Sequence, residues 1–236
     1  MTTTEPDADF WGEISGVAIH FPIVVEEMNS ATLAFSVPIE AARELIVVDG
    51  FTVAEVGPDT AMLIVALCDY IRNPWGDYNE VNFALLAHPT DQADRVGAYV
   101  WSMPVDQEFT CAAGNAVLGL PKSVEELTVD YTDTEVVFDL AMEGSRVLKV
   151  TLPRVPSSGE PVSETTITYS HLDDRPTEVP LTIDLPTGVI DAADVRIELG
   201  VGMLADDLWS LGLPTTPDYA AWGEGLTGRF DRPRPI

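Results

Sequence analysis

The chain has 236 residues, an apolar fraction of 46% and a formal net charge of −27. This length and apolar content are sufficient for a well-buried core, which excludes an intrinsically disordered chain. A surface this acidic repels phosphate backbones and anionic lipid headgroups, so we expect neither nucleic acid nor a membrane as a partner.

Most of the chain consists of short β-branched and aromatic runs bounded by Gly, Pro or Asp, a pattern typical of strands. Frequent turn signals between these runs favour an antiparallel sheet or a barrel-like fold. The segment Glu143-Gly144-Ser145 joins two of the runs and predicts a hairpin turn. In chain order the predicted strands are Ala31–Val37, Phe51–Val56, Thr60–Tyr70, Tyr78–His88, Val96–Asp106, Leu127–Asp133, Glu135–Met142, Arg146–Val155, Ser163–His171 and Val195–Leu199.

Helical sequence is confined to short stretches. Ile39–Ile46 follows a Ser and a Pro that favour a helix start, and it carries Ala, Arg, Glu and Leu. Asp106–Leu118 is rich in Ala and ends at Gly119, a residue that commonly terminates helices. Leu204–Leu211 repeats leucine at helical spacing.

Domain boundaries are not visible, because the chain contains no internal repeat and no obvious linker. We expect residues 1–236 to form a single domain with irregular tails at 1–15 and 227–236. The longest apolar run is far shorter than a membrane-spanning helix, and the acidic N-terminal residues differ from the basic start of a secretory signal. These features predict a soluble, cytoplasmic protein.

Motifs of several common enzyme classes are absent. The sequence has no nucleophile-elbow serine, no P-loop, no zinc-protease helix and no glycine-rich dinucleotide loop after a strand. His20, His88 and His171 are scattered, and Cys68 and Cys111 lack the spacing of a zinc or redox site. We therefore expect no metal site.

Lysine is rare, since only Lys122 and Lys149 occur among the twelve basic residues. Lys122 follows a predicted helix end and an apolar stretch. In an apolar pocket the charged form of a lysine is penalised, so the pKa of Lys122 is predicted to fall toward neutrality. The free amine could then condense with a ketone, and the protonated imine would act as an electron sink. From composition alone, an ordinary surface lysine is an equal alternative.

The segment Gly119-Leu120-Pro121-Lys122 resembles the Schiff-base lysine motif of the acetoacetate decarboxylase family. Upstream, Gly76-Asp77-Tyr78-Asn79-Glu80-Val81 resembles the strand of that family whose glutamate reaches the lysine. The two motifs occur in the order and separation of the family, and the resemblance covers most of residues 30–215. Acetoacetate decarboxylase is itself a known example of an activated lysine. The resemblance implies a mainly β (α+β), mostly antiparallel cone- or barrel-like fold with a few helices, assembled as a homo-oligomer.

The resemblance also implies roles for individual residues. Lys122 matches the imine-forming lysine, and Glu80 matches the active-site carboxylate that shuttles a proton or orients the substrate. Tyr78 lies two residues from Glu80 on the same strand face, so we expect it in the wall of the substrate site, with Asn79 pointing the opposite way. A solvent-facing strand glutamate is the alternative for Glu80.

The chain departs from the family pattern at several positions. Ser123 stands where a second lysine follows the first, and Asn115 and Ala116 replace an arginine and a glutamate of the motif. The family places an arginine near the substrate carboxylate in its N-terminal segment, whereas this chain has no arginine before Arg43. His20 lies in roughly that region and is our candidate to replace it.

These features together predict a lyase that forms a Schiff base through Lys122 with a small β-keto acid or ketone. Decarboxylation ranks ahead of aldolase- or dehydratase-type imine chemistry. The alternatives are a non-catalytic family member that binds a small ligand, and an unrelated β domain with Lys122 on its surface. No cofactor is expected, because the lysine itself serves as the electron sink.

Overall fold

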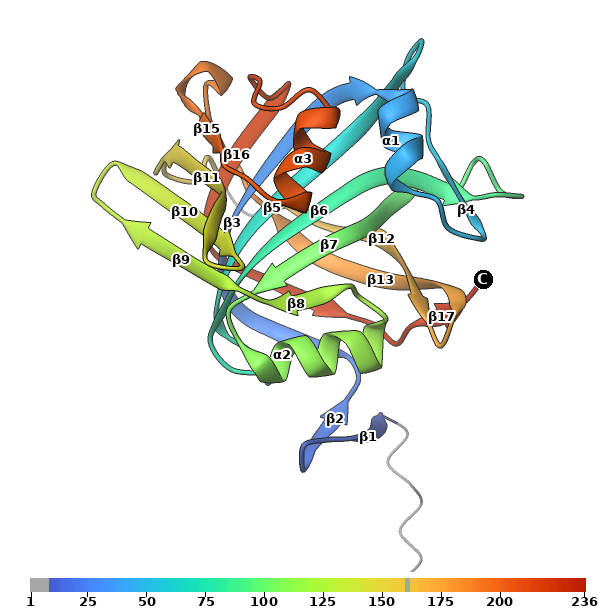
Figure 1. Ribbon diagram of the computed structural model, residues 1–236. Helices are drawn as coiled ribbons and strands as arrows, with labels where there is room; N and C mark the ends of the chain where they lie inside the picture. Colours follow the sequence, from blue (N-terminus) through green and yellow to red (C-terminus); the bar gives the residue numbers. More distant parts are fainter. Residues whose placement is uncertain (1–8, 160–161) are drawn as a thin grey trace, which may run out of the picture.

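A computed structural model describes residues 9–159 and 162–236. Its centre is a closed barrel of seven strands, because β16 pairs with β3 on one side and with β13 on the other (Figure 1). Neighbouring barrel strands run antiparallel, apart from β7 and β12, which are parallel. The barrel strands are β3 (Ile23–Pro38), β5 (Thr60–Arg72), β6 (Tyr78–Pro89), β7 (Gly97–Val105), β12 (Val162–Leu172), β13 (Arg175–Leu185) and β16 (Tyr219–Phe230). The predicted mainly β, barrel-like fold with a few helices is confirmed.

The barrel strands bury side chains on both faces. In β5, Leu63, Val65 and Leu67 belong to the main hydrophobic core outside the barrel, whereas Cys68 and Tyr70 pack in a separate cluster that faces the interior. A strand buried on both faces reads as a near-continuous apolar run rather than as a strict alternation. This explains the unbroken apolar sequence of β5.

A second, four-stranded sheet and two helices cover the outer face of the barrel. Side chains of the second sheet, such as Phe138, and of both helices share one hydrophobic core with outward side chains of the barrel, such as Phe83. Glu143 and Gly144 have positive φ angles of 52° and 75°, as a tight hairpin turn requires, and this turn was predicted. The elements are β9 (Glu126–Tyr131), β10 (Glu135–Met142), β11 (Ser145–Pro153), β15 (Arg196–Leu199), α1 (Ile39–Leu45) and α3 (Met203–Ser210).

The remaining predicted helix, Asp106–Leu118, is an α-helix in its first part and a π-helix in its second part. It begins as α2 (Glu108–Ala113) and continues as a π-helix over Gly114–Leu118, which ends at Gly119 with φ 66°. π-Helical turns are rare and frequently accompany functional sites. The remaining short elements are β1 (Phe10–Ile14), β2 (Val17–His20), β4 (Phe51–Val53), β8 (Lys122–Val124), β14 (Gly188–Val189), β17 (Arg234–Pro235) and a 3₁₀ turn at Ala192–Asp194.

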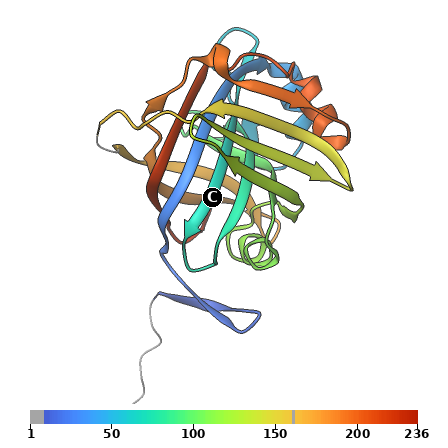
Figure 2. The ribbon, with the colours of Figure 1, turned by 90° about the vertical axis from the view of Figure 1, so that its left-hand side faces the viewer.

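The prediction of an irregular N-terminal tail is wrong for the part that the structure describes. β1 lies within the expected tail 1–15 and pairs with β2 in an antiparallel hairpin; residues 1–8 lie outside the described residues. Phe10 packs against the ring of His20 across the hairpin, with ring centroids 5.4 Å apart. Figure 2 shows that the hairpin projects away from the barrel.

The prediction of an irregular C-terminal tail over 227–236 is also wrong. β16 continues to Phe230, which pairs with Ile23 on one side and with Leu181 on the other. β17 then pairs with β13. Glycines interrupt the apolar pattern of β16, and its pairing with β3 shifts register between Gly223 and Leu226, so this barrel-closing strand lacks the usual sequence signal.

Candidate active site

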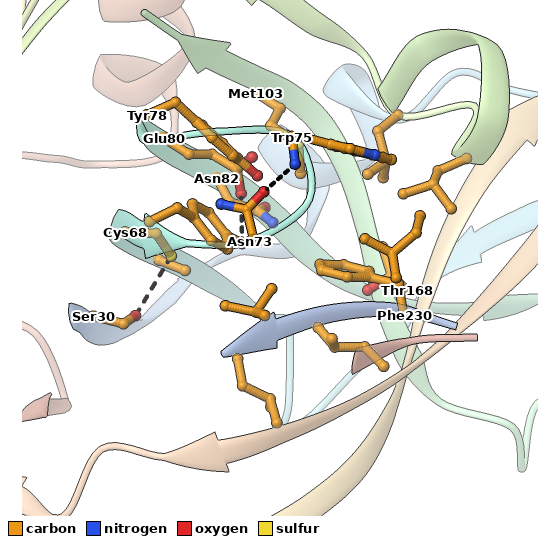
Figure 3. Close-up of a pocket in the computed structure, with 18 of the residues that line it drawn as sticks. Ser30, Cys68, Asn73, Trp75, Tyr78, Glu80, Asn82, Met103, Thr168 and Phe230 are labelled. Carbon is orange, nitrogen blue, oxygen red and sulfur yellow. Dashed lines mark hydrogen bonds between the residues drawn. The ribbon is translucent and has the colours of Figure 1, made fainter. Parts of the chain in front are cut away.

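The interior of the barrel holds a cavity of about 110 Å³, and all seven barrel strands contribute to its wall. Tyr78, Glu80 and Asn82 lie together at one end, and Thr168 and Phe230 lie apart from them at the other (Figure 3). Pockets for drug-sized ligands measure about 300–1,000 Å³, whereas an apolar cavity of about 150 Å³ binds benzene. The cavity is therefore of a size for a small organic molecule.

The backbone after the π-helix places Lys122 in the cavity wall. β8 begins at Lys122 and pairs in parallel with β7, opposite Met103. The Lys122 N–H donates a hydrogen bond to Asn115 Oδ1 at 2.8 Å, and Asn115 Nδ2 donates one to the Lys122 carbonyl at 3.0 Å. The Lys122 side chain runs against Gly114, where a Cβ atom would lie 2.7 Å from Lys122 Cδ. Gly114 therefore makes room for the lysine, and Asn115 fixes its main chain.

Lys122 and Glu80 form a buried ion pair. Lys122 Nζ lies 2.7 Å from Glu80 Oε2, and the two side chains are only 2% and 5% exposed. Nζ also donates a hydrogen bond to Thr110 Oγ1 at 3.1 Å, and the Tyr70 hydroxyl donates one to Glu80 Oε1 at 3.4 Å. The groups that hold both carboxylate oxygens and the ammonium thus come from four separate elements, β5, β6, β8 and α2. The two alternatives, a surface position for Lys122 and a solvent-facing Glu80, are therefore excluded.

Aromatic rings enclose the ammonium group. Nζ lies 4.8 Å from the centroid of the Tyr78 ring and 5.9 Å from that of Trp75. The Tyr78 ring stacks on Tyr70 with centroids 4.4 Å apart. Burial raises the pKa of Tyr78 to about 12 although Lys122 opposes the shift, so the phenol stays protonated. The faces of electron-rich rings attract a cation, and these contacts hold the amine in place.

The charge state of Lys122 differs from the prediction. Burial, the largest single influence, lowers the pKa of Lys122, as expected from the sequence, but the interactions with Glu80 and Tyr78 together raise the pKa above its ordinary value. The prediction of a pKa shifted toward neutrality is therefore wrong for the pair at rest. Lys122 rests as an ammonium ion, and a free amine requires that its proton first be transferred.

The other predicted site residues are divided between the cavity and the surface. Tyr78 lines the cavity with Glu80, and Asn79 points away, donating to Asp106 Oδ2 at 2.7 Å, as strand alternation predicts. His20 is exposed on the β1–β2 hairpin and is not part of the cavity wall. The structure therefore brings Lys122, Glu80 and Tyr78 together but leaves His20 outside.

Several residues of the site were missed by sequence reasoning. Asn82 lies on the cavity face of β6, two residues after Glu80, and the alternation that identified Tyr78 could have found it. Thr110, Tyr70 and Asn115 reach the pair from other elements. Asn115 lies at a position of the lysine motif, whereas the sequence neighbourhoods of Thr110 and Tyr70 carry no comparable signal, because their contacts depend on tertiary packing.

Two further properties of the described residues concern metal sites and membrane-spanning helices. Among the described residues, no group of three or more His, Cys, Asp or Glu side chains is placed to hold a metal ion. Within residues 9–159 and 162–236, no helix is long and apolar enough to cross a membrane.

Comparisons with known proteins identify relatives. The family model described as "Acetoacetate decarboxylase (ADC)" matches residues 15–200. Among curated proteins, none matches this sequence.

Solved structures share the fold at low sequence identity. An acetoacetate decarboxylase from Legionella pneumophila has a TM-score of 0.68 and 11% identity, with 100% of this chain and 92% of that chain covered. A second acetoacetate decarboxylase structure has a TM-score of 0.66 and 14% identity over 91% of this chain and 89% of that one. The enduracididine biosynthesis enzyme MppR, complexed with the condensation product of pyruvate and imidazole 4-carboxaldehyde, has a TM-score of 0.57 and 16% identity over 91% and 88% of the two chains.

Proposed function

This chain belongs to the acetoacetate decarboxylase family, and from that premise we propose that it is an enzyme that forms an imine between Lys122 and a small carbonyl compound. The observation that carries the proposal is the buried contact of 2.7 Å between Lys122 Nζ and Glu80 Oε2 in the cavity wall. Buried ion pairs contribute little to stability relative to apolar residues of similar size. A lysine and a glutamate facing a cavity are therefore better explained by chemistry than by stability.

Glu80 is the partner that makes the resting ammonium nucleophilic. Transfer of one proton from Nζ to Oε2 gives a neutral amine and a neutral carboxylic acid, without a change in total charge. The amine adds to the substrate carbonyl carbon, and the acid then protonates the resulting hydroxyl so that water leaves. The products of this step are a protonated imine on Lys122 and a carboxylate on Glu80, which again form an ion pair.

The imine supports more than one subsequent reaction. A β-keto acid would lose CO2, and its electron pair would move into the protonated imine. A ketone would lose an α-proton to Glu80 and form an enamine that attacks a second carbonyl group. The MppR structure contains a condensation product, which favours aldol-type chemistry as an alternative to decarboxylation for an imine at Lys122.

Reductive trapping tests the proposal. The protein is incubated with small keto acids and ketones in the presence of cyanoborohydride, and intact and peptide masses are measured. Because Lys122 and Lys149 are the two lysines of the chain, Lys149→Ala is a matched control for Lys122→Ala. We expect a reduced adduct in the wild type and in Lys149→Ala, and none in Lys122→Ala.

The same experiment separates the enzyme from a non-catalytic binding protein. Circular dichroism of Lys122→Ala, and of Lys122→Met if the alanine variant is unfolded, establishes that a lost adduct reflects the missing amine. If the wild type forms no adduct with any carbonyl compound while remaining folded, Lys122 is not a nucleophile and the chain is a ligand-binding member of the family.

A further inference from the structure

The charges in the cavity wall restrict the substrate. Of the twelve Lys and Arg residues, all of which lie in the described part of the chain, Lys122 alone lines the cavity. Its charge is already balanced by Glu80 at 2.7 Å. The other ionisable carboxyl group along the wall is Asp184, whose pKa is lowered by hydrogen bonds from Ser163 and Thr227 that outweigh its burial, so it also carries a negative charge. A substrate carboxylate would therefore have no cationic partner of its own.

An unpaired carboxylate in this cavity is unfavourable for two reasons. Removing an ion from water costs several kcal/mol unless a partner and hydrogen bonds compensate it. The net charge of −27 also creates a field that disfavours the entry of an anion. A neutral carbonyl compound encounters neither penalty.

Charge conservation during imine chemistry leads to the same conclusion. The Lys122–Glu80 pair has zero net charge as ammonium and carboxylate, as amine and acid, and as protonated imine and carboxylate. When Glu80 removes an α-proton, the pair becomes a neutral enamine and a neutral acid. A neutral substrate therefore leaves the net charge of the Lys122–Glu80 pair at zero at every step, whereas a keto acid adds one uncompensated negative charge throughout.

The wall also provides an acceptor for a hydroxyl group. Asn82 faces the cavity beside Glu80, and within the described part of the chain its buried Oδ1 has no hydrogen-bond donor. Buried polar atoms usually have a partner, and the substrate hydroxyl of a β-hydroxy ketone could donate to this oxygen. Apolar side chains, among them Val25, Ile183 and Phe230, make up much of the remaining cavity wall.

We infer that the substrate is a neutral aldehyde or ketone without a carboxylate. A hydroxyl group near the substrate carbonyl increases the rate at which Lys122 forms the imine. This inference rests on the proposed imine chemistry and reverses the ranking of decarboxylation made from the sequence. Cleavage of a β-hydroxy ketone then proceeds from the protonated imine. The hydroxyl turns its proton from Asn82 to Glu80, which takes it. The bond between the α- and β-carbons then breaks, a carbonyl compound leaves, and the electron pair forms the enamine. Glu80 returns the proton to the α-carbon, and water releases the second ketone and the amine.

A set of three probes tests the inference on the full chain. Acetoacetate and methyl isobutyl ketone have nearly the same shape, but a carboxylate in the first is an isopropyl group in the second. Diacetone alcohol differs from methyl isobutyl ketone by one hydroxyl. Trapping rates at Lys122 are measured with cyanoborohydride and divided by the rates of the same probes with free Nα-acetyl-lysine. A salt concentration of about 1 M reduces the Debye length to ~3 Å, so the ratios report the cavity rather than the distant surface charge.

The inference predicts that methyl isobutyl ketone is trapped at least about tenfold faster than acetoacetate, a difference of ~1.4 kcal/mol. A smaller ratio, or a preference for acetoacetate, overturns it and leaves the imine proposal intact. Absence of an adduct with all three probes overturns both. Diacetone alcohol should be trapped faster than methyl isobutyl ketone, and Asn82→Leu should bring the ratio of these two rates close to one. An unchanged ratio in Asn82→Leu contradicts the role of Asn82.

Discussion

The two faces of strand β6 differ in their surroundings: one packs in the hydrophobic core and the other lines the cavity. Val81, Phe83 and Leu85 point out of the barrel into the main hydrophobic core, where all three are fully buried. Tyr78 and Glu80, on the alternate face, line the cavity with Lys122. Side chains alternate across a strand, so residues one position apart are placed in environments of different chemistry.

The difference indicates that the outward face of β6 mainly stabilises the fold, whereas the inward face carries the groups proposed for imine chemistry. Full burial of a large apolar side chain stabilises a protein by about 1.5–3 kcal/mol, so the outward face contributes to the free energy of folding. The inward face contains an ion pair whose desolvation cost offsets much of its attraction. We therefore expect substitutions on the outward face to lower stability, and substitutions on the inward face to change imine formation.

Among variants that retain Lys122, the largest expected effect on chemistry comes from Glu80→Gln. The amide can neither accept the Lys122 proton nor return it to the departing hydroxyl, so the rate of adduct trapping should fall by about 10²–10⁴-fold, the usual contribution of a general acid–base group. The control is Glu178→Gln, which breaks the ion pair with Arg95 outside the cavity wall. Equal trapping rates in Glu80→Gln and Glu178→Gln would remove Glu80 from the mechanism.

The largest expected effect on stability comes from Phe83→Ala. Truncation of a fully buried Phe leaves a void in the core, and the free energy of unfolding should fall by about 3–5 kcal/mol in urea titrations. Phe230→Ala, a partly buried ring of the cavity wall, should cost less stability. The trapping rate of folded Phe83→Ala should remain close to that of the wild type. A folded variant with a strongly reduced rate would show that the two faces are coupled.

Gly114→Ala should affect both properties at once. The added Cβ would lie 2.7 Å from Lys122 Cδ, so the lysine has to move away from Glu80. We expect a loss of about 1–3 kcal/mol in stability, as for other overpacked sites, and a slower trapping reaction. Gly12→Ala is the matched control, because nothing lies within 4 Å of a Cβ at that position. Identical trapping in both variants would contradict the close fit of Lys122 against Gly114.

The last expected effect concerns alkaline stability and is absent at neutral pH. Burial raises the pKa of the Cys68 thiol from 9.0 to about 12, with a further contribution from Glu80. Above pH 9 the unfolded chain releases a proton that the folded chain retains, so the free energy of unfolding falls as pH rises through this window. The slope from one such group is about 1.4 kcal/mol per pH unit. Cys68→Ala should therefore show a shallower alkaline decrease in urea titrations, and an unchanged slope would contradict the buried neutral thiol.

Local sequence patterns predicted much of the fold but not its closure. The alternation in Tyr78–Glu80 correctly predicted that both side chains share one face of the strand. Each of the ten predicted strands corresponds to an observed strand. β13 was missed because Pro176 and Pro180 interrupt it, and β16 was missed because of its glycines. These strands complete the barrel, so the barrel-like fold was expected mainly from the family resemblance.

The candidate site was predicted in part for a related reason. Lys122 and Glu80 were found through two motifs, but their charge state depends on a distance of 2.7 Å that no motif specifies. The sequence suggested that desolvation would set the pKa of Lys122, whereas in the folded chain the interactions with Glu80 and Tyr78 together raise this pKa despite burial. Likewise, the absence of a substrate-binding cation from the described cavity wall follows from packing rather than from composition.

The protonation of Lys122 is the most direct test of the central claim that Glu80 stores and moves its proton. Incorporation of ε-¹³C-lysine gives two lysine signals in an NMR titration, with Lys149 as the internal reference. The account predicts that Lys122 titrates above its ordinary value of 10.5 in the wild type and below that value in Glu80→Gln, where burial acts without the carboxylate. A wild-type Lys122 that titrates below 10.5, or a titration unaffected by Glu80→Gln, would contradict the account.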